Sequence, residues 1–429
     1  MADGDGSGRP RIEGSLHPAF TPVAEALERQ LARSTGGAAV CVWHDGECVA
    51  DLWGGQRNRA GDPWRRDTLA PSFSTTKGVA TTLVHVLVDR GLLSYDDCVA
   101  EYWPEFAQNG KERITLRQVL AHQSGLYHIR QMIDHADRML DWDHMVQAIA
   151  RARPIHEPGT RTGYHGLTYG FLVGEILRRV TNTPFPALVQ REIVGPLELD
   201  GLYVGAPAAA IPRAAELLWT QNPALGARLR IPESGIGSIA WKTWAAIVQR
   251  MAGTMGFQLD LVSIFDALAP RGISSFQFDA EHTLRASIPA ANGLFTARSL
   301  AKLYAVLAGG GSLQGVRLLS RETLAAATAV QQAPRGRVVI PFDMRWRLGW
   351  HGVFTTRGVP RRAFGHFGFG GSGAWADPGR NLAVALIVNG GMGTPFGDLR
   401  IARIGGAALD SLRSRPRAPR PRAAAGTAG

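Results

Sequence analysis

The stretch SFSTTK places Ser74 three residues before Lys77. On a helix, residues at this spacing share a face, so the serine hydroxyl and the lysine amine can come within hydrogen-bonding distance. A serine hydroxyl becomes a nucleophile when a base takes its proton, and a lysine can be that base if burial or neighbouring cations lower its pKa. The spacing therefore indicates nucleophilic catalysis. The competing interpretation is a polar helix start, because serine is also a common N-cap.

The same spacing occurs a second time, at Ser299 and Lys302. That pair lies inside a helical pattern whose leucines supply the apolar stripe, and Lys302 is expected on the solvated face. Ser74 instead stands at the start of its helical pattern, where the unpaired N–H groups of a helix end can stabilise an oxyanion. The position at a helix start, more than the spacing to a lysine, favours Ser74 over Ser299 as the nucleophile.

Strand and helix patterns surround these residues. The segment GAAVCVWHDGECVADLWGG consists of two β-rich runs around Asp45-Gly46, a dipeptide typical of tight hairpins. Residues 75–90 follow a helical period that ends at Gly91, which suits a left-handed cap. The segment FGHFGFGGSGAWADPGRNLAVALIVNGG predicts three strands with a turn at Asp377-Pro378-Gly379. The two ends of the chain are therefore expected to share one antiparallel sheet.

The predicted fold class is α+β, with an antiparallel sheet flanked by helices and an inserted, mainly helical domain. Residues 15–110 and 285–411 are assigned to the α/β domain, and residues 111–284 to the helical one. Residues 1–14 and the basic tail 412–429 are expected to be disordered, because neither carries enough apolar surface to fold.

The charge of the chain argues against nucleic-acid binding as its main function. The formal net charge is +11, but much of the excess lies in the Pro/Ala/Gly-rich tail, in Arg413, Arg415, Arg417, Arg420 and Arg422. The chain has only four lysines, Lys77, Lys111, Lys242 and Lys302, and shows no basic stripe interleaved with aromatic residues. We expect no nucleic-acid partner.

Other segments bear on compartment and cofactors. The N-terminus lacks a basic region followed by an apolar run, and no apolar stretch reaches the roughly 18 residues of a membrane span. These features predict a cytoplasmic protein without membrane association. Cys41, Cys48 and Cys98 fit no metal-ligand spacing and are expected to be buried, reduced thiols. The sequence therefore calls for no metal and no other cofactor.

Several segments, in order along the chain, resemble the serine β-lactamase-like superfamily, in particular class C β-lactamases and family VIII carboxylesterases. They are residues 50–126 around SFSTTK, then TGYHGLTYGFLVGEILRRVTN, EIVGPLELDGLYVG, PAANGLFTARSLAKLYAVLAGGG and FGHFGFGGSGAWADPGRNLAVALIVNGG. Together they cover residues 15–410. The resemblance implies a β-lactamase/transpeptidase-like fold with its active site between the α/β domain and the helical domain.

The resemblance implies catalytic roles for three residues. Ser74 corresponds to the nucleophile and Lys77 to the partner that lowers its proton affinity. Tyr164, in the segment Tyr-His-Gly, matches the tyrosine of the second motif. As a phenolate beside a buried ammonium, Tyr164 would take the serine proton and return it to the leaving group. The alternative is a buried structural tyrosine that bonds the backbone.

The third motif aligns with His366-Phe367-Gly368, which Phe369 follows. By analogy, the backbone N–H groups of Ser74 and Phe369 form the oxyanion hole, and His366, Phe367 and Gly368 bind substrate. A histidine beside glycines is otherwise often structural.

Two departures from the β-lactamase pattern favour an esterase. Gly166 stands where those enzymes carry an asparagine, and His366 where they carry a lysine. A site without these donors should bind an anionic β-lactam poorly, since a charged hydrogen bond contributes about 1.5–3 kcal/mol.

The function predicted from the sequence is a serine hydrolase with a Ser74 acyl-enzyme, in particular a carboxylesterase on small or medium esters. Its expected partner is a small-molecule ester or acyl donor. Three alternatives stand beside it: an acyltransferase that passes the acyl group to an alcohol or amine in a biosynthetic pathway, a β-lactamase or D-amino peptidase, and a non-catalytic scaffold. The sequence selects neither the acyl group, nor the acceptor, nor the oligomeric state.

Overall fold

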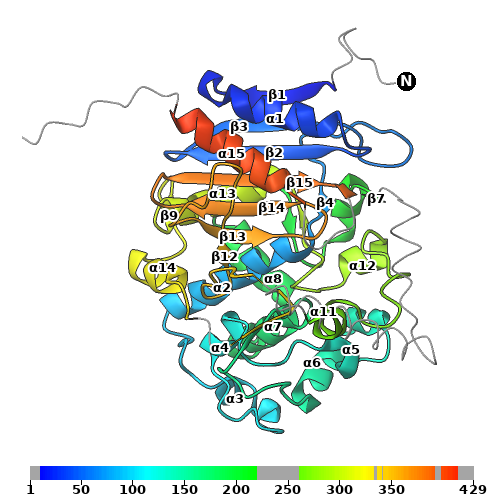
Figure 1. Ribbon diagram of the computed structural model, residues 1–429, viewed down its shortest axis with the longest axis vertical. Helices are drawn as coiled ribbons and strands as arrows, with labels where there is room; N and C mark the ends of the chain where they lie inside the picture. Colours follow the sequence, from blue (N-terminus) through cyan, green and yellow to red (C-terminus); the bar gives the residue numbers. More distant parts are fainter. Residues whose placement is uncertain (1–9, 220–259, 333–335, 341, 392–397, 414–429) are drawn as a thin grey trace, which may run out of the picture.

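A seven-stranded antiparallel sheet joins the two ends of the chain (Figure 1) in the order β1-β3-β2-β15-β14-β13-β12. The computed structural model describes residues 10–219, 260–332, 336–340, 342–391 and 398–413. β2 and β15 pair along their full length, with Ala38 opposite Val388 and His44 opposite Leu382. The shared sheet predicted from the sequence is therefore confirmed. Its strands are β1 (Ile12–Leu16), β2 (Ala38–His44), β3 (Glu47–Gly54), β12 (His351–Gly352), β13 (Phe364–Phe367), β14 (Gly373–Asp377) and β15 (Leu382–Val388).

The turn between β2 and β3 has the geometry that its sequence predicts. Asp45 and Gly46 both adopt left-handed backbone angles, with φ of 53° and 81°. A two-residue turn of this kind matches the twist of the flanking strands, which explains the preference for Asp-Gly.

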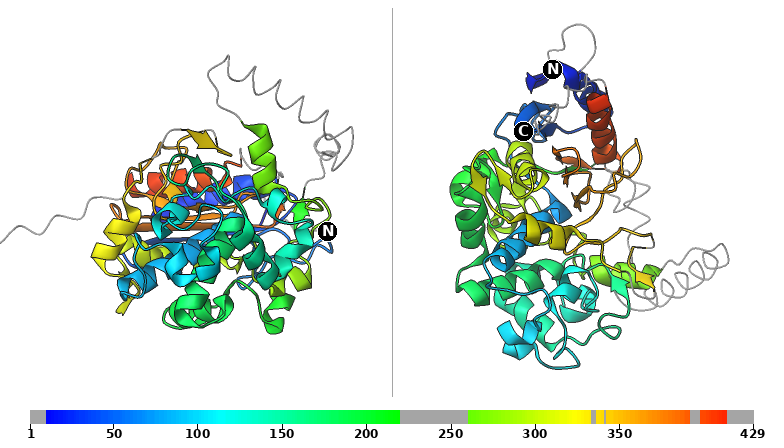
Figure 2. Two further views of the ribbon diagram at one scale, coloured as in Figure 1. Left: turned by 90° about the horizontal axis from the view of Figure 1, so that it is seen from below. Right: turned by 90° about the vertical axis from the view of Figure 1, so that its left-hand side faces the viewer.

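The two faces of the sheet are covered by different helices. Helices α1 (Thr21–Leu31) and α15 (Arg400–Arg413) lie over one face, as the side view shows (Figure 2, right), and α13 (Ala297–Ala308) lies on the other. Successive residues of a strand face opposite sides, so Val40 packs under α1 and α15, while Ala39 packs toward α13. The α13 face is rich in small side chains, which let the helix approach the strands closely: Ala374, Ala376, Ala383 and Ala385.

Helix α2 (Thr76–Asp89) runs through the centre of the molecule. Its residues from Thr76 to Leu87 are all buried, as expected for a helix that is surrounded by protein. The helical region below the sheet in Figure 1 packs around it. None of the described helices is both long and apolar enough to cross a membrane. The other helices are α3 (Val99–Tyr102), α4 (Leu116–Leu120), α5 (Ile129–Met132), α6 (Trp142–Arg151), α7 (Thr168–Thr181), α8 (Phe185–Val189), α11 (Leu261–Leu268), α12 (Glu281–Arg285) and α14 (Arg321–Thr328).

Two small sheets tie distant segments together. β4 (Ala70–Pro71) pairs with β8 (Leu294–Phe295), which also pairs with β6 (Leu202–Tyr203). β5 (Thr162–Gly163) pairs in parallel with β11 (Arg337–Val338). Both sheets join residues that the sequence assigns to different domains, so the two predicted domains are bridged beside the site.

The predicted disordered N-terminus is partly wrong. Residues 12–14 belong to β1, whose Ile12 lies opposite Gly54 of β3, because an edge strand gains backbone hydrogen bonds from its neighbour. At the other end, α15 continues to Arg413, past the predicted boundary of the tail. Residues 1–9, the tail from 414, and residues 220–259 of the predicted helical domain lie outside the described residues.

The close approach of α13 to the sheet can be tested with Ala385→Leu. Ala385 is fully buried, and a larger side chain must push the helix away. We expect the free energy of unfolding to fall by about 1–3 kcal/mol in urea denaturation. The matched control is Ala325→Leu on the exposed side of α14, where the change should stay within about 0.5 kcal/mol. Equal losses at the two positions would contradict the packing described.

Candidate active site

Ser74 is presented by an otherwise buried loop. It lies in a short 3-10 turn, Phe73–Thr75, that leads directly into α2. From Thr68 to Leu87, Ser74 is the one residue that is not buried. The loop is held by its own hydroxyl groups, since the Thr76 hydroxyl donates to the carbonyl of Phe73 at 2.5 Å and accepts from the N–H of Gly293 at 2.8 Å. The predicted position of Ser74 at a helix start is confirmed.

Among the described residues, Lys77 has three polar partners, and none of them is a carboxylate. Its Nζ lies 2.9 Å from Ser74 Oγ, 2.6 Å from the carbonyl oxygen of Gly166 and 2.9 Å from that of Ala290. The side chain is fully buried, and this burial holds the pKa of the amine well below its ordinary value of 10.5. A neutral amine has two N–H donors and one lone pair, so the two carbonyls take the donors. The lone pair is left for the hydroxyl proton of Ser74.

A second buried lysine shows what a structural role looks like. Lys111 Nζ contacts three carbonyl oxygens, those of Gln108, Ala150 and Ala152, at 2.7, 2.9 and 2.6 Å. Three acceptors use all three N–H groups of an ammonium, and the lysine thereby caps the end of α6. Burial lowers the pKa of Lys111 only to about 8. Lys77 differs because one of its partners is a hydroxyl that can donate.

Tyr164 approaches the same oxygen from another direction. Its hydroxyl lies 2.9 Å from Ser74 Oγ, so the structure brings Ser74, Lys77 and Tyr164 together. Burial raises the pKa of the Tyr164 phenol above its ordinary value. Burial thus favours the neutral phenol and the neutral amine over the predicted pair of phenolate and ammonium, and the role of Tyr164 stays a prediction. In these states Tyr164 donates to Ser74 Oγ, and Ser74 donates to Lys77.

A network of buried rings fixes Tyr164. Its ring stacks on Trp346, with centroids 5.7 Å apart, and meets His122 edge to face at 5.0 Å. The next residue, His165, holds Ser124 Oγ at 2.6 Å and His122 Nδ1 at 3.3 Å. Burial lowers the pKa of His165 to about 3 and that of His122 well below its ordinary value, so both rings are neutral. The network positions the tyrosine without adding charge.

The third motif lies against the nucleophile loop. A side chain at Gly368 would overlap the carbonyl oxygen of Ser72, so glycine is required there. His366 is buried, and its Nδ1 lies 3.1 Å from the carbonyl oxygen of Phe367. A carbonyl only accepts, so the proton is assigned to Nδ1, and Nε2 becomes an acceptor. Within the described part of the chain, Nε2 has no hydrogen-bond partner.

The side chain of Phe367 faces away from His366, and its part in substrate binding stays a prediction. Neighbouring residues of a strand face opposite sides, and the Phe367 ring packs with the apolar residues under α1 and α15, on the side away from His366. Phe369 lies in the turn after β13, with its ring 5.5 Å from that of Phe73. The turn thus lies beside the nucleophile loop, while the oxyanion hole of Ser74 and Phe369 stays a prediction.

Two aromatic rings, those of Phe278 and Phe369, contact Phe73, the residue before the nucleophile, and we call this group of three rings the clasp. Phe73 has a left-handed backbone with φ of 47°, which is an outlier for a bulky side chain and costs of order 1–3 kcal/mol. Such a conformation persists only where its surroundings enforce it. The ring of Phe73 contacts those of Phe278, at 5.0 Å, and Phe369, at 5.5 Å. These contacts help to orient Ser74 toward its two partners.

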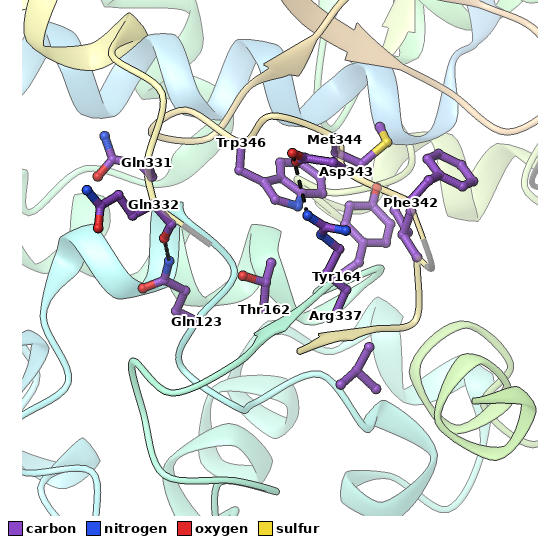
Figure 3. A pocket seen from close by; sticks show the side chains of 12 residues that line it. Gln123, Thr162, Tyr164, Gln331, Gln332, Arg337, Phe342, Asp343, Met344 and Trp346 are labelled. Atoms are coloured by element: carbon purple, nitrogen blue, oxygen red, sulfur yellow. Dashed lines mark hydrogen bonds and ion pairs between the residues drawn. The ribbon is translucent and has the colours of Figure 1, made fainter. Parts of the chain in front are cut away.

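A narrow hollow adjoins Tyr164 (Figure 3). The rings of Tyr164 and Trp346 form one of its walls, and Arg337 pairs with Asp343 across 3.5 Å. Arg337 is the one cation among the described residues that line the hollow, and its charge is balanced by this ion pair. The full lining is Gln123, Thr162, Tyr164, Gln331, Gln332, Arg337, Val338, Ile340, Phe342, Asp343, Met344 and Trp346.

The glycine of the second motif lies against α11. A side chain at Gly166 would overlap Leu268 and lie 3.2 Å from the carbonyl oxygen of Ala267, both on α11. The place that an asparagine side chain would need is therefore filled by this helix.

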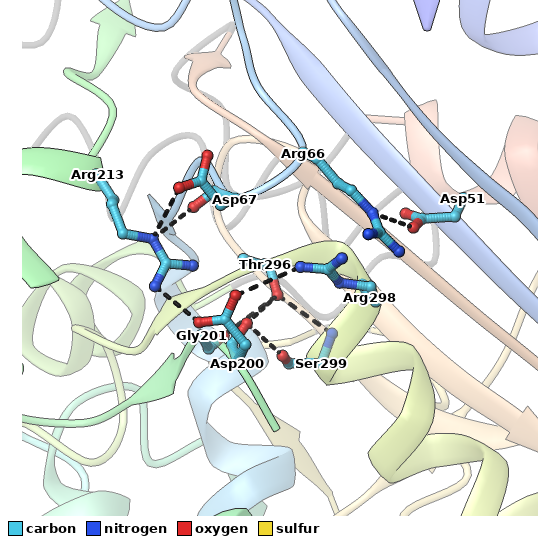
Figure 4. Close-up of polar contacts among 9 residues, drawn as sticks. All are labelled: Asp51, Arg66, Asp67, Asp200, Gly201, Arg213, Thr296, Arg298 and Ser299. Atoms are coloured by element: carbon cyan, nitrogen blue, oxygen red, sulfur yellow. Dashed lines mark hydrogen bonds and ion pairs between the residues drawn. The ribbon is translucent and has the colours of Figure 1, made fainter. Parts of the chain in front are cut away.

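The lookalike pair at Ser299 and Lys302 is structural (Figure 4). Ser299 Oγ donates to the carbonyl of Asp200 at 2.8 Å, and the side chain of Asp200 pairs with Arg213 at 2.7 Å. Lys302 was expected on a solvated face, but it is half-buried and donates to the carbonyl of Leu197 at 2.8 Å. Neither residue contacts the other in the way that Lys77 contacts Ser74.

Some of the partners in this site escape sequence analysis. Gly166 and Ala290 contribute only backbone oxygens, and no residue type signals a carbonyl that will face a lysine. The His122–His165 contact and the Phe73–Phe278 contact each join segments far apart in the chain. The only visible trace of Phe278 is an aromatic residue two positions after another, Phe276.

Comparisons with known proteins agree with this geometry. A family model described as beta-lactamase matches residues 23–409. Esterase/beta-lactamase LipL of Mycobacterium tuberculosis is 37% identical over 392 residues, which are 90% of this chain and 85% of that protein. The crystal structure of a family VIII carboxylesterase matches with a TM-score of 0.79 and 32% identity, over 94% of this chain and 100% of that one. A penicillin-binding protein homolog from Caulobacter crescentus matches with a TM-score of 0.76 and 34% identity, over 94% and 100%. The resemblance and the fold class predicted from the sequence are confirmed.

The protonation state of Lys77 can be tested through the reactivity of Ser74 toward a fluorophosphonate probe. Because burial lowers the pKa of the amine well below 10.5, the labelling rate should reach its plateau at a pH well below 10.5 and fall only as acid protonates Lys77. Lys77→Arg, which is always charged, should label about 10²–10⁴-fold more slowly. The control Lys302→Met should label normally. A rate that keeps rising up to pH 10 would contradict a neutral amine.

The clasp can be tested with Phe278→Ala. Removing this ring frees the backbone of Phe73 to relax, and a nucleophile displaced by about 1 Å loses up to about 100-fold in rate. We expect slower fluorophosphonate labelling of Ser74 in a protein whose circular dichroism is unchanged. Phe278→Leu should restore much of the rate. The control is Phe276→Ala, because the Phe276 ring lies 4.9 Å from that of Phe278. This substitution should slow labelling less. A loss as large as that of Phe278→Ala would count against the clasp.

Proposed function

The chain belongs to the beta-lactamase family, and from this premise we propose that it is a serine carboxylesterase that cleaves small or medium-sized neutral esters through a Ser74 acyl-enzyme. The observation that carries the proposal is the position of Ser74 Oγ, 2.9 Å from both Lys77 Nζ and Tyr164 Oη. One oxygen thus has a base and a proton donor in contact with it, while the residues around it keep both in their neutral forms.

In the acylation step, the Lys77 amine takes the hydroxyl proton of Ser74, and Oγ attacks the ester carbonyl carbon. By family analogy, the N–H groups of Ser74 and Phe369 stabilise the oxyanion that forms. Tyr164 donates its proton to the departing alcohol, which would otherwise leave as an alkoxide. The proton held by Lys77 then restores the phenol.

In the deacylation step, the same groups act on water. Lys77 takes a proton from a water molecule that attacks the acyl-enzyme, and the Ser74 oxygen is the leaving group. The proton returns to Ser74, and the free acid departs. Ser74, Lys77 and Tyr164 all return to their starting protonation states at the end of the cycle, so the proposed reaction needs no cofactor.

Three features favour a neutral ester over an anionic β-lactam. α11 fills the space beside Gly166, so no side-chain amide can bind the lactam there. His366 stands where β-lactamases carry a lysine, and burial lowers its pKa well below the ordinary value, so it offers a neutral acceptor. Arg337, at the hollow beside Tyr164, is already paired with Asp343. An anionic substrate would therefore lack the charged contact that contributes about 1.5–3 kcal/mol.

The proposal can be tested with p-nitrophenyl esters of increasing acyl length and with nitrocefin. Wild type should hydrolyse the short and medium esters and act much more slowly on nitrocefin. Ser74→Ala should lose about 10³-fold or more of kcat, because the whole mechanism passes through Oγ. The matched control is Ser299→Ala, which removes the other serine of this spacing and should keep its activity. Ester hydrolysis by folded Ser74→Ala at the wild-type rate would falsify the proposal.

The same assay separates the remaining alternatives. Adding an alcohol or amine and measuring the ratio of ester or amide product to free acid distinguishes an acyltransferase from a hydrolase. D-amino acid amides test the peptidase alternative. A non-catalytic scaffold would leave Ser74 unlabelled by a fluorophosphonate probe.

A further inference from the structure

Two cysteines meet across the first hairpin, away from Ser74. Cys41 lies on β2 and Cys48 on β3, and their sulfur atoms are 3.7 Å apart. Cys48 lies opposite Trp43, and an irregularity of register between Val42 and Trp43 shifts the strands beside it. Because opposite residues of paired strands share a face, both thiols lie on the side of the sheet that carries Trp43.

The two thiols have different environments. Cys41 is fully buried, whereas Cys48 is exposed. Burial raises the pKa of Cys41 well above its ordinary value, while the hydrogen bond with Cys41 lowers the pKa of Cys48. Cys48 is thus the more acidic and the more accessible of the two thiols. An exposed thiolate beside a second thiol is the arrangement by which proteins react with peroxides.

We propose that Cys41 and Cys48 form an oxidisable pair in which a hydroperoxide attacks Cys48 first and Cys41 resolves the product to a cross-strand disulfide. The Cys48 thiolate attacks the peroxide, whose O–O bond breaks, and the products are a sulfenic acid and, after uptake of one proton, water or an alcohol. The Cys41 thiol then attacks the Cys48 sulfur, forming the S–S bond and releasing the sulfenic oxygen as water together with the Cys41 proton. The two thiols lose two electrons, and the peroxide gains them.

The geometry permits this closure. A disulfide bond is about 2 Å long, so the sulfur atoms must approach each other by about 1.7 Å. Cys48 is exposed, so its side chain can rotate, while Cys41 is held by the packed strand. The expectation of buried thiols is therefore wrong for Cys48, which is exposed, while Cys41 is buried as expected.

Cys98 supplies an internal comparison. It precedes α3, at the opposite end of the molecule from the hairpin (Figure 1), and is also a free thiol. It is half-buried and lacks the neighbouring sulfur that the pair possesses. It should therefore oxidise more slowly, and not to an intramolecular disulfide.

The experiment exposes the full-length protein to hydrogen peroxide, alkylates the remaining thiols, and maps the digested peptides by mass. The expected product is one linkage between the peptides of Cys41 and Cys48, with a loss of about 2 Da for two hydrogen atoms. Cys41→Ser should instead accumulate a sulfenic acid at Cys48, which dimedone captures. Cys48→Ser should leave Cys41 reduced, and Cys98→Ser should behave as wild type.

Each other outcome would overturn the proposal. Wild type that carries only sulfenic or sulfinic acid at Cys48 would show that Cys41 does not resolve it. Faster oxidation of Cys98 would show that the pair has no special reactivity. Peptide mapping of wild type decides the question even if a serine variant fails to fold. Fluorophosphonate labelling of Ser74 before and after oxidation serves as a folding control, since the hairpin lies outside that site.

Discussion

The candidate active site depends on one buried amine, Lys77, that contacts no carboxylate in the part of the chain that the structure describes. Burying a charged ammonium in this way would cost several kcal/mol, so the protein keeps Lys77 neutral and gives its two N–H groups to backbone carbonyls. This choice determines the rest of the chemistry. Once both donors are used, the remaining lone pair faces Ser74 Oγ, and the serine proton has a base. The same burial keeps Tyr164 as a phenol, so the second group on Oγ is a donor.

The elements around the site bring backbone carbonyl groups from distant segments into contact with Lys77. Gly166 and Ala290 lie 124 residues apart in the numbering, and their carbonyls converge on one nitrogen because β4 pairs with β8 and because Ser72 N–H bonds the carbonyl of Gly293. Gly368 then lets the end of β13 approach the same loop. The same arrangement strains the backbone of Phe73. The loop must turn sharply there to expose Ser74 while the residues on either side stay buried.

Local patterns predicted the local structure well. The Asp45-Gly46 hairpin, the helix that ends before Gly91 and the three strands from 364 to 388 each follow from turn chemistry and periodicity, which act over few residues. The contacts within the candidate site were harder to predict from the sequence. Residue types marked Ser74, Lys77 and Tyr164, but the partners of Lys77 are carbonyls, which every residue has. The motif likewise identified the strand that carries Phe367 but did not indicate which face of the sheet its ring takes.

Charge is the physical basis for proposing a neutral ester as the substrate. Burial favours the amine form of Lys77, the phenol form of Tyr164 and the neutral imidazole of His366, and these three forms together carry no net charge. The first charge appears when the proton moves from Ser74 to Lys77 and the oxyanion forms, and in a low-dielectric site these opposite charges attract each other strongly. A carboxylate already present on the substrate would favour the protonated form of Lys77 before the reaction begins, and so would weaken the base. The same neutrality that activates Ser74 thus argues for a neutral ester as its substrate.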